Sequence, residues 1–163
     1  MRKRSVLLFI LAGILLGAAT VPSTTSKPAT APSTKPAAGT ATTSAPAFKS
    51  AKDGIYNDVQ LARGKTAYLA SCARCHGDTL GGNDDAVPLV GNDFLNDWAA
   101  KSVGDFEEYT RKNMPSDGPG KLSRREVTDI VVFILNQNSF PAGKNELPAD
   151  VDVMNAIPIQ VKK

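Results

Sequence analysis

The strongest helical pattern in the chain follows Ser123. Apolar side chains recur there at the spacing of one helix face, and further apolar residues between them predict that most of the helix circumference is buried. Ser123 and Glu126 have the spacing of a capping box, and Leu122 and Val127 have that of a hydrophobic staple. The apolar positions are Val127, Ile130, Val131, Val132, Phe133, Ile134 and Leu135.

Residues 57–71 predict an earlier helix. Asn57 is a suitable cap, and Gln60 stands at the position of its partner in a capping box. Gly64 is unusual in this segment, because a glycine inside a helix costs about 1 kcal/mol relative to alanine. It marks either a close crossing by another helix or a tolerated defect. The apolar side of this helix is formed by Leu61, Tyr68 and Leu69.

Shorter helical segments are predicted between these two. Ser102 and Asp105 open a helix that continues to Asn113 and delivers Met114 at its end. Residues 94–98 predict one further turn of helix. Because strand-like alternation is almost absent, the pattern predicts an all-α fold.

The chain divides by composition into four parts. Residues 1–21 combine a cationic start, an apolar run and small residues, which predicts an export signal cleaved after Ala19. The apolar run is barely long enough to span a bilayer, so an uncleaved anchor is the alternative. Residues 22–47, rich in Pro, Thr, Ser and Ala, predict a disordered linker. We expect the folded domain over residues 48–138 and a C-terminal extension packed on it over residues 139–163.

The formal net charge of +3 is unevenly distributed. Residues 1–47 hold five Lys and Arg and no acid, whereas residues 48–163 hold 14 Lys and Arg against 16 Asp and Glu. A net charge of −2 on the folded part does not indicate nucleic-acid binding. The basic pairs at 111–112 and 124–125 flank the Met114 loop, and they form either a docking rim or an ordinary solvated surface.

The candidate chemistry lies in Cys72-Ala73-Arg74-Cys75-His76. Cys-x-x-Cys-His is the spacing that attaches a haem covalently, because each thiol can form a thioether with one haem vinyl group. The adjacent His76 then lies under the iron. We therefore predict one haem c, with its iron, bound by Cys72, Cys75 and His76.

Three other uses of two nearby cysteines were weighed. A structural zinc site needs more ligands than the two Cys and one His of the chain supply. A thioredoxin-like dithiol follows a strand and starts a helix, whereas this motif ends a helical stretch. A plain structural disulfide is the third alternative. All three fit the surrounding sequence less well than haem attachment does.

The other face of the iron needs a ligand that is not histidine, because His76 is the only one in the chain. Met, Lys, water or no ligand remain. Met1 is the initiator and Met154 lies in the tail, whereas Met114 lies in a loop whose Pro and Gly residues can aim its thioether inward. We predict iron ligation by His76 and Met114.

Over about residues 55–138 the chain resembles class I c-type cytochromes. Gly64 and Tyr68 occupy the positions at which the first helix of that family crosses the last, and Ile130 and Phe133 match the partners on the last helix. The resemblance implies a small fold of about three to five helices around one haem, with the N- and C-terminal helices crossing.

Two more positions are assigned through the resemblance. Pro88 matches the family's proline whose carbonyl accepts a hydrogen bond from the ligand histidine, which would orient the ring. Trp98 is the candidate for the tryptophan that binds a haem propionate in many relatives, with core packing as the alternative.

A narrower likeness is to haem subunits or domains associated with pyrroloquinoline-quinone (PQQ)-dependent dehydrogenases. It implies such a quinoprotein as an electron donor. The chain is too short to be that dehydrogenase itself, because a propeller needs about 40 residues per blade. The segments concerned are 54–56, 94–98, 114–123, 140–144 and 146–148.

The predicted function is single-electron transfer between redox proteins in the periplasm, by a mono-haem cytochrome that is not an enzyme. Ligands on both faces of the iron leave no open site for a substrate. Membrane attachment is expected only if the N-terminal segment is retained. The alternatives are a haem enzyme or gas sensor with an open or labile distal site, and a haem-free thiol oxidoreductase.

Overall fold

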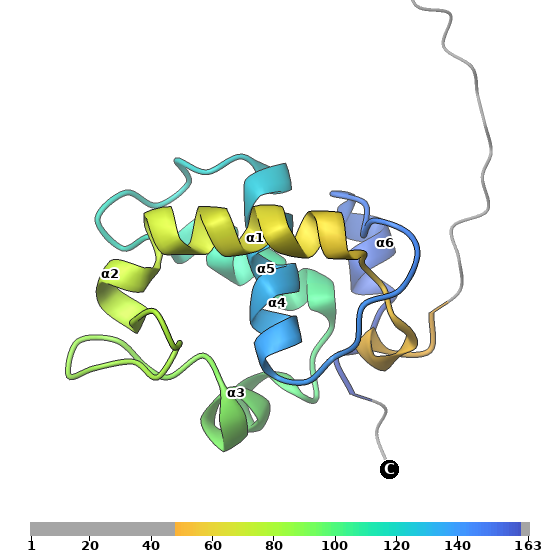
Figure 1. Ribbon diagram of the computed structural model, residues 1–163, viewed down its shortest axis with the longest axis horizontal. Helices are drawn as coiled ribbons and strands as arrows, with labels where there is room; N and C mark the ends of the chain where they lie inside the picture. The colour runs from red at the N-terminus through yellow and green to blue at the C-terminus, as the bar shows by residue number, and fades with distance from the viewer. Residues whose placement is uncertain (1–47, 161–163) are drawn as a thin grey trace, which may run out of the picture. The chain divides into compact units, whose positions relative to one another are not determined.

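The computed structural model describes residues 48–160. The predicted export signal and linker lie outside the described residues, as do residues 161–163. The described part is helical and contains only isolated β-bridges, so the all-α fold class is confirmed. The elements, shown in Figure 1, are the 3-10 helix η1 (Ala51–Asp53) and the α-helices α1 (Asp58–Ser71), α2 (Ala73–His76), α3 (Gly91–Trp98), α4 (Val103–Asn113), α5 (Arg124–Gln137) and α6 (Val151–Asn155).

Side-chain caps begin the long helices where the sequence predicts. The Asn57 side chain accepts a hydrogen bond from the backbone N–H of Gln60 at the start of α1. Ser102 with Asp105, and Ser123 with Glu126, form complete capping boxes at α4 and α5. These reciprocal bonds satisfy backbone N–H groups that have no partner inside the helix.

Gln60 does not complete a capping box, which corrects the sequence prediction. Its side chain is 2% exposed and pairs with the backbone of Leu147 in the C-terminal extension. The amide nitrogen donates to the Leu147 carbonyl (3.0 Å), and the Leu147 N–H donates to Gln60 Oε1 (2.8 Å). A buried amide that satisfies both backbone groups of a distant residue stabilises the fold more than an exposed cap would.

Helix α1 lies across α5, and this is the largest contact between any two elements (Figure 1). A Cβ atom on Gly64 would lie 1.9 Å from the carbonyl oxygen of Asp129, so only glycine permits the approach. The Tyr68 and Phe133 rings pack beside it with centroids 5.2 Å apart. The predicted close crossing is confirmed, and the atoms nearest to Gly64 belong to Asp129 and Phe133.

The apolar face predicted for α5 is buried along its whole length, whereas that of α1 is narrower than predicted. Leu69 is 45% exposed, and the buried positions of α1 are Gln60, Gly64 and Tyr68. Helix α3 begins at Gly91, before the predicted turn, because the Asn138 side chain accepts a hydrogen bond from the Gly91 N–H (2.9 Å). That contact joins residues 47 positions apart and could not be read from local sequence.

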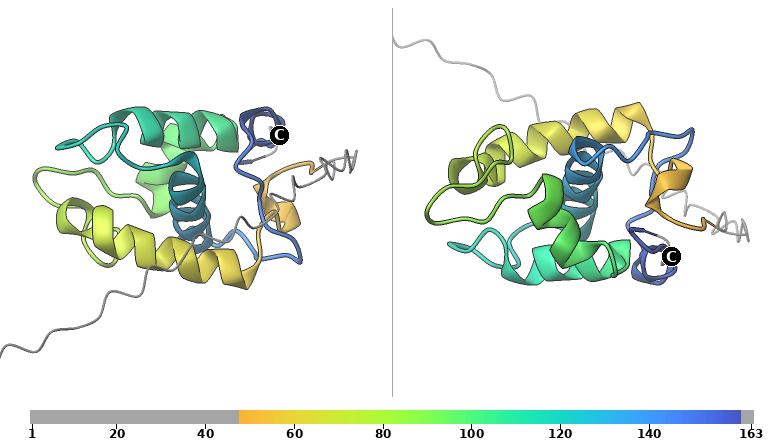
Figure 2. Two further views of the ribbon diagram at one scale, coloured as in Figure 1. Left: turned by 90° about the horizontal axis from the view of Figure 1, so that it is seen from above. Right: turned by 90° about the horizontal axis from the view of Figure 1, so that it is seen from below.

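The segment after α5 wraps the helices. Phe140, Leu147 and Ile157 are almost completely buried, and the carbonyl of Ile157 accepts a hydrogen bond from the N–H of Val103 (2.8 Å). Both views of Figure 2 place η1 and α6 at one end of the described domain. The opposite end holds α2, the segment 77–90 and the loop that follows α4.

Candidate functional site

The Cys-x-x-Cys-His motif lies at the junction between α1 and α2. Cys72 caps the end of α1, donating its N–H to the Tyr68 carbonyl (2.8 Å), and α2 covers residues 73–76. The N–H groups of Cys75 and His76 both donate to the carbonyl of Cys72, at 3.1 and 3.0 Å. These hydrogen bonds form one tight turn, which fixes the relative positions of the two cysteines and His76.

The His76 ring is oriented by the backbone of the following segment. Its Nδ1 lies 2.9 Å from the carbonyl oxygen of Val87, and the residue is 8% exposed. Because a carbonyl only accepts hydrogen bonds, Nδ1 must carry the proton, which leaves the lone pair of Nε2 for a metal.

The acceptor is Val87, which corrects the assignment to the carbonyl of Pro88. The two residues share one peptide bond, and a proline nitrogen has no hydrogen to donate. A residue before proline is also restricted towards extended conformations. The Val87–Pro88 peptide therefore presents a carbonyl oxygen to His76, while its nitrogen, that of Pro88, needs no hydrogen-bond partner.

Met114 lies at the end of α4, as predicted. It caps that helix in an extended conformation, with its N–H donating to the carbonyl of Thr110 (2.8 Å), and its side chain is half-buried. The loop that follows Met114 connects α4 to Ser123, the N-cap of α5.

The donor set fits haem c. Cys72 and Cys75 are free thiols rather than a disulfide, and His76 keeps one ring nitrogen for iron. Burial, with a smaller contribution from nearby Cys75, raises the pKa of Cys72 to about 11. A reactive thiolate requires a lowered pKa, so Cys72 is not suited to be the attacking thiol of an oxidoreductase.

Residues 59–134 match the family described as "Cytochrome C oxidase, cbb3-type, subunit III". This match supports a class I c-type cytochrome domain over residues 59–134. Its cofactor is covalently bound haem c with iron, and its chemistry is electron transfer. No curated protein matches the chain.

Among solved structures, the chain is similar to a chain of the sulfane dehydrogenase SoxCD from Paracoccus pantotrophus. The match has 22% sequence identity and a TM-score of 0.41, and it covers 61% of this chain and 53% of that chain. The chain thus spans about half the length of the SoxCD chain it matches. Within residues 48–160 of the cytochrome, no helix has the length and apolar character needed to cross a bilayer.

Trp98 of the cytochrome packs within an aromatic cluster. Its ring centroid lies 4.6 Å from that of Phe106 and 5.3 Å from that of Tyr109. The ammonium group of Lys101 lies 4.1 Å from the same ring, on the solvent side of the cluster. These contacts favour core packing, the alternative role of Trp98.

The basic residues around the Met114 loop have acidic partners, which disfavours a free positive docking rim. Glu108 accepts from Lys112 (2.8 Å), and it also contacts the guanidinium groups of Arg111 and Arg124 at 3.1 and 3.2 Å. Arg124 also binds Glu107, a fully buried carboxylate whose pKa is raised by burial. Arg124 therefore links α5 to α4, whereas Arg111 and Lys112 form ion pairs within α4.

Sequence analysis missed one ion pair beside the motif. Arg74, between the two cysteines, donates to Asp117 in the Met114 loop at 2.6 Å. The sequence did place a positive charge near His76 and a negative charge near Met114, which was the signal available for this pair. Only the fold brings together residues 43 positions apart.

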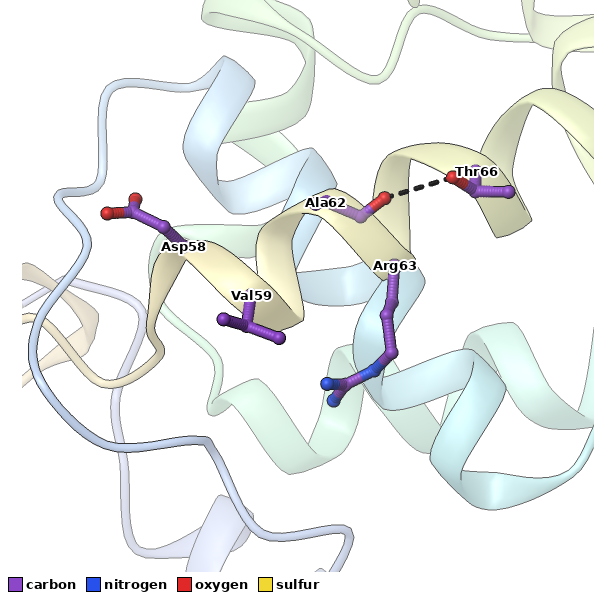
Figure 3. Close-up of a pocket in the computed structure, with 5 residues that line it drawn as sticks. All are labelled: Asp58, Val59, Ala62, Arg63 and Thr66. Carbon is purple, nitrogen blue, oxygen red and sulfur yellow. Dashed lines mark hydrogen bonds between the residues drawn. The ribbon is translucent and has the colours of Figure 1, made fainter.

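A broad surface depression lies elsewhere, along the outer face of the first half of α1 (Figure 3). Every lining residue comes from this one helix. The Thr66 hydroxyl donates to the carbonyl of Ala62, and the Arg63 guanidinium is bound by Asp129 and Glu146. The depression brings together no set of side chains that could hold a cofactor, so we assign the functional site to the haem motif at the far end of α1.

Proposed function

We propose that the chain is an exported mono-haem c-type cytochrome that carries single electrons between redox proteins. The observation that carries this proposal is the orientation of His76. The Nδ1–H of His76 donates to the Val87 carbonyl, so Nε2 is the nitrogen available to iron. The two free cysteines of the motif precede His76 in the sequence. A hydrogen-bonded imidazole is also a more basic ligand.

Each residue of the site has one role in this proposal. Cys72 and Cys75 anchor the cofactor through thioethers, His76 is the proximal ligand and Met114 the distal one. When bound, haem c supplies one-electron exchange at iron, and a thioether ligand favours the reduced state. With His76 and Met114 as its two protein ligands, the iron would have no free position for oxygen or substrate.

We further propose that the cytochrome accepts electrons from a PQQ-dependent dehydrogenase. Support comes from two of the segments that resemble haem subunits or domains of these dehydrogenases, 54–56 and 140–144, which contact each other in the fold. The Gly143 N–H donates to the carbonyl of Tyr56, and a Cβ on Gly143 would lie 1.9 Å from the carbonyl oxygen of Gly54. We also propose a periplasmic location, directed by residues 1–21, with membrane attachment only if that segment is retained.

Purification from an exporting host tests the proposal. The mature protein should absorb in the Soret region, and its intact mass should exceed that of the polypeptide by one haem. The oxidised form should show the red-end sulfur-to-iron band, and carbon monoxide should not bind the reduced form. A colourless product would overturn the proposal. Carbon monoxide binding would instead favour an open distal site.

Matched methionine variants assign the distal ligand. Met114→Leu should abolish the sulfur band and allow carbon monoxide to bind, because leucine has no ligating atom. Met154→Leu is the control, since Met154 is fully buried beside Thr128 and leucine conserves its volume. A sulfur band that survives in Met114→Leu and disappears in Met154→Leu would reassign the ligand.

A further inference from the structure

The Arg74–Asp117 ion pair joins the two segments that carry the iron ligands. Arg74 lies in α2, two residues before His76, and Asp117 lies three residues after Met114. The guanidinium nitrogen and the carboxylate oxygen are 2.6 Å apart. The pair therefore bridges from the proximal to the distal side of the site.

The loop 115–121 has few other attachments. Its backbone hydrogen bonds are internal turns: Gly118 donates to Pro115 (2.9 Å) and Lys121 to Gly118 (3.3 Å). Across residues 48–160, the bond from Arg74 to Asp117 is the only hydrogen bond or ion pair that connects this loop to the rest of the fold. Its removal would leave the loop held by its two ends and by apolar contact alone.

We propose that Arg74 and Asp117 form a latch that positions the Met114 loop and thereby favours the seating of Met114 on the iron. This inference rests on the proposed function. Both residues are positioning residues, because they act through Met114. The side chains are 70% and 57% exposed, and an exposed ion pair shifts an equilibrium by only about 1.5- to 5-fold. A latch of this strength biases the loop without locking it.

Imidazole is a probe of the latch, because it competes with Met114 for ferric iron. In the holoprotein at low salt, Arg74→Gln and Asp117→Asn should each lower the apparent Kd for imidazole about 2- to 5-fold, read from loss of the sulfur band. The double variant should match the single variants, since the same interaction is removed once. Salt should lower the Kd of the wild type towards that of the variants, because it screens the pair.

The control is Lys112→Ala. It removes another exposed ion pair, Lys112–Glu108 (2.8 Å), that lies within α4 and does not cross to α2. Its imidazole Kd should equal that of the wild type. The reversed pair, Arg74→Asp with Asp117→Arg, should restore the wild-type Kd, which a purely structural role of either residue would not do.

The outcomes separate the latch from the proposed function. Asp117→Asn lies outside the attachment motif, so it remains informative if Arg74→Gln impairs haem attachment. An unchanged Kd in Asp117→Asn, or an equal decrease in Lys112→Ala, overturns the latch. A wild-type protein without any sulfur band overturns Met114 ligation itself, and with it the premise of the latch.

Discussion

The α1–α5 crossing and the haem-attachment end are held together in different ways. At the crossing, Gly64 lies against the carbonyl of Asp129, and Arg63 binds that residue through two hydrogen bonds of 2.9 and 3.2 Å. Arg63 also binds Glu146 at 2.8 and 2.9 Å, so one side chain joins α1, α5 and the C-terminal extension.

The haem-attachment end has fewer such contacts. The loop 115–121 has one polar connection to the rest of the fold within residues 48–160, and Val87 is 64% exposed although its carbonyl orients His76. The chain thus completes the crossing with its own groups. At the other end, in the proposed function, the haem supplies the common partner of the motif, segment 77–90 and the Met114 loop.

The largest effect is expected from loss of the cofactor. Replacing both cysteines, Cys72→Ser with Cys75→Ser, removes both thioethers, and the free energy of unfolding should fall by more than about 5 kcal/mol, the upper end for core truncations. Three segments lose their shared partner at once. Urea unfolding followed by circular dichroism measures this loss. A loss smaller than that of any side-chain variant below would show that the haem-attachment end is self-sufficient.

A methyl group at the crossing should have the next largest effect. Gly64→Ala places its Cβ against the Asp129 carbonyl, and the two helices must separate, so we expect a loss of about 3 kcal/mol. Gly81→Ala is the matched control in the haem-side segment, because its Cβ meets only Thr79 Oγ1 at 3.6 Å. Thermal unfolding of the two variants tests the contrast. Equal losses would contradict it.

Truncation of Gln60 tests the tie to the C-terminal extension. Gln60→Ala leaves the buried N–H and carbonyl of Leu147 without partners and should cost about 2 kcal/mol. Thr66→Ala, on the exposed side of the same helix, should change the free energy of unfolding by less than about 0.5 kcal/mol. If Gln60→Ala behaves like its control, the extension is held by apolar contact alone.

The smallest effect concerns pH and the ion pairs that Glu108 forms, chiefly within α4. Hydrogen bonds from Lys112 and Arg111 lower the pKa of Glu108 from 4.5 to about 2. Since the folded-state pKa is depressed, its stabilisation is complete above pH 4.5 and is lost as the pH falls towards about 2.

Glu108→Gln should therefore flatten the decrease of Tm over that pH interval, measured by thermal scans at pH 5 and at lower pH. Asp84→Asn is the control, because Asp84 is exposed and has no ion pair with any residue in 48–160. A parallel flattening in the control would show that net charge, rather than the ion pairs of Glu108, sets the pH response.

The local features of this protein follow from residues that are close together in the sequence. Helix starts at Asn57, Ser102 and Ser123 depend on groups a few residues apart, and the buried face of α5 follows from its apolar periodicity. The motif likewise sets the order of the Cys72 and Cys75 thiols and the imidazole, because all lie on one turn. Gly64 alone left a helix crossing and a tolerated defect open, and the resemblance to class I c-type cytochromes favoured the crossing.

Contacts between distant groups depend instead on how the helices pack. In the folded chain, the carbonyl of Val87 accepts the hydrogen bond from His76, and the Gln60 side chain pairs with Leu147. The first N–H of α3, that of Gly91, donates to the Asn138 side chain. Arg74 likewise pairs with Asp117 across 43 positions. Each of these polar groups had many possible partners in the sequence, and the choice among them depends on how the helices pack, since a hydrogen bond or ion pair forms only where packing brings both atoms within reach.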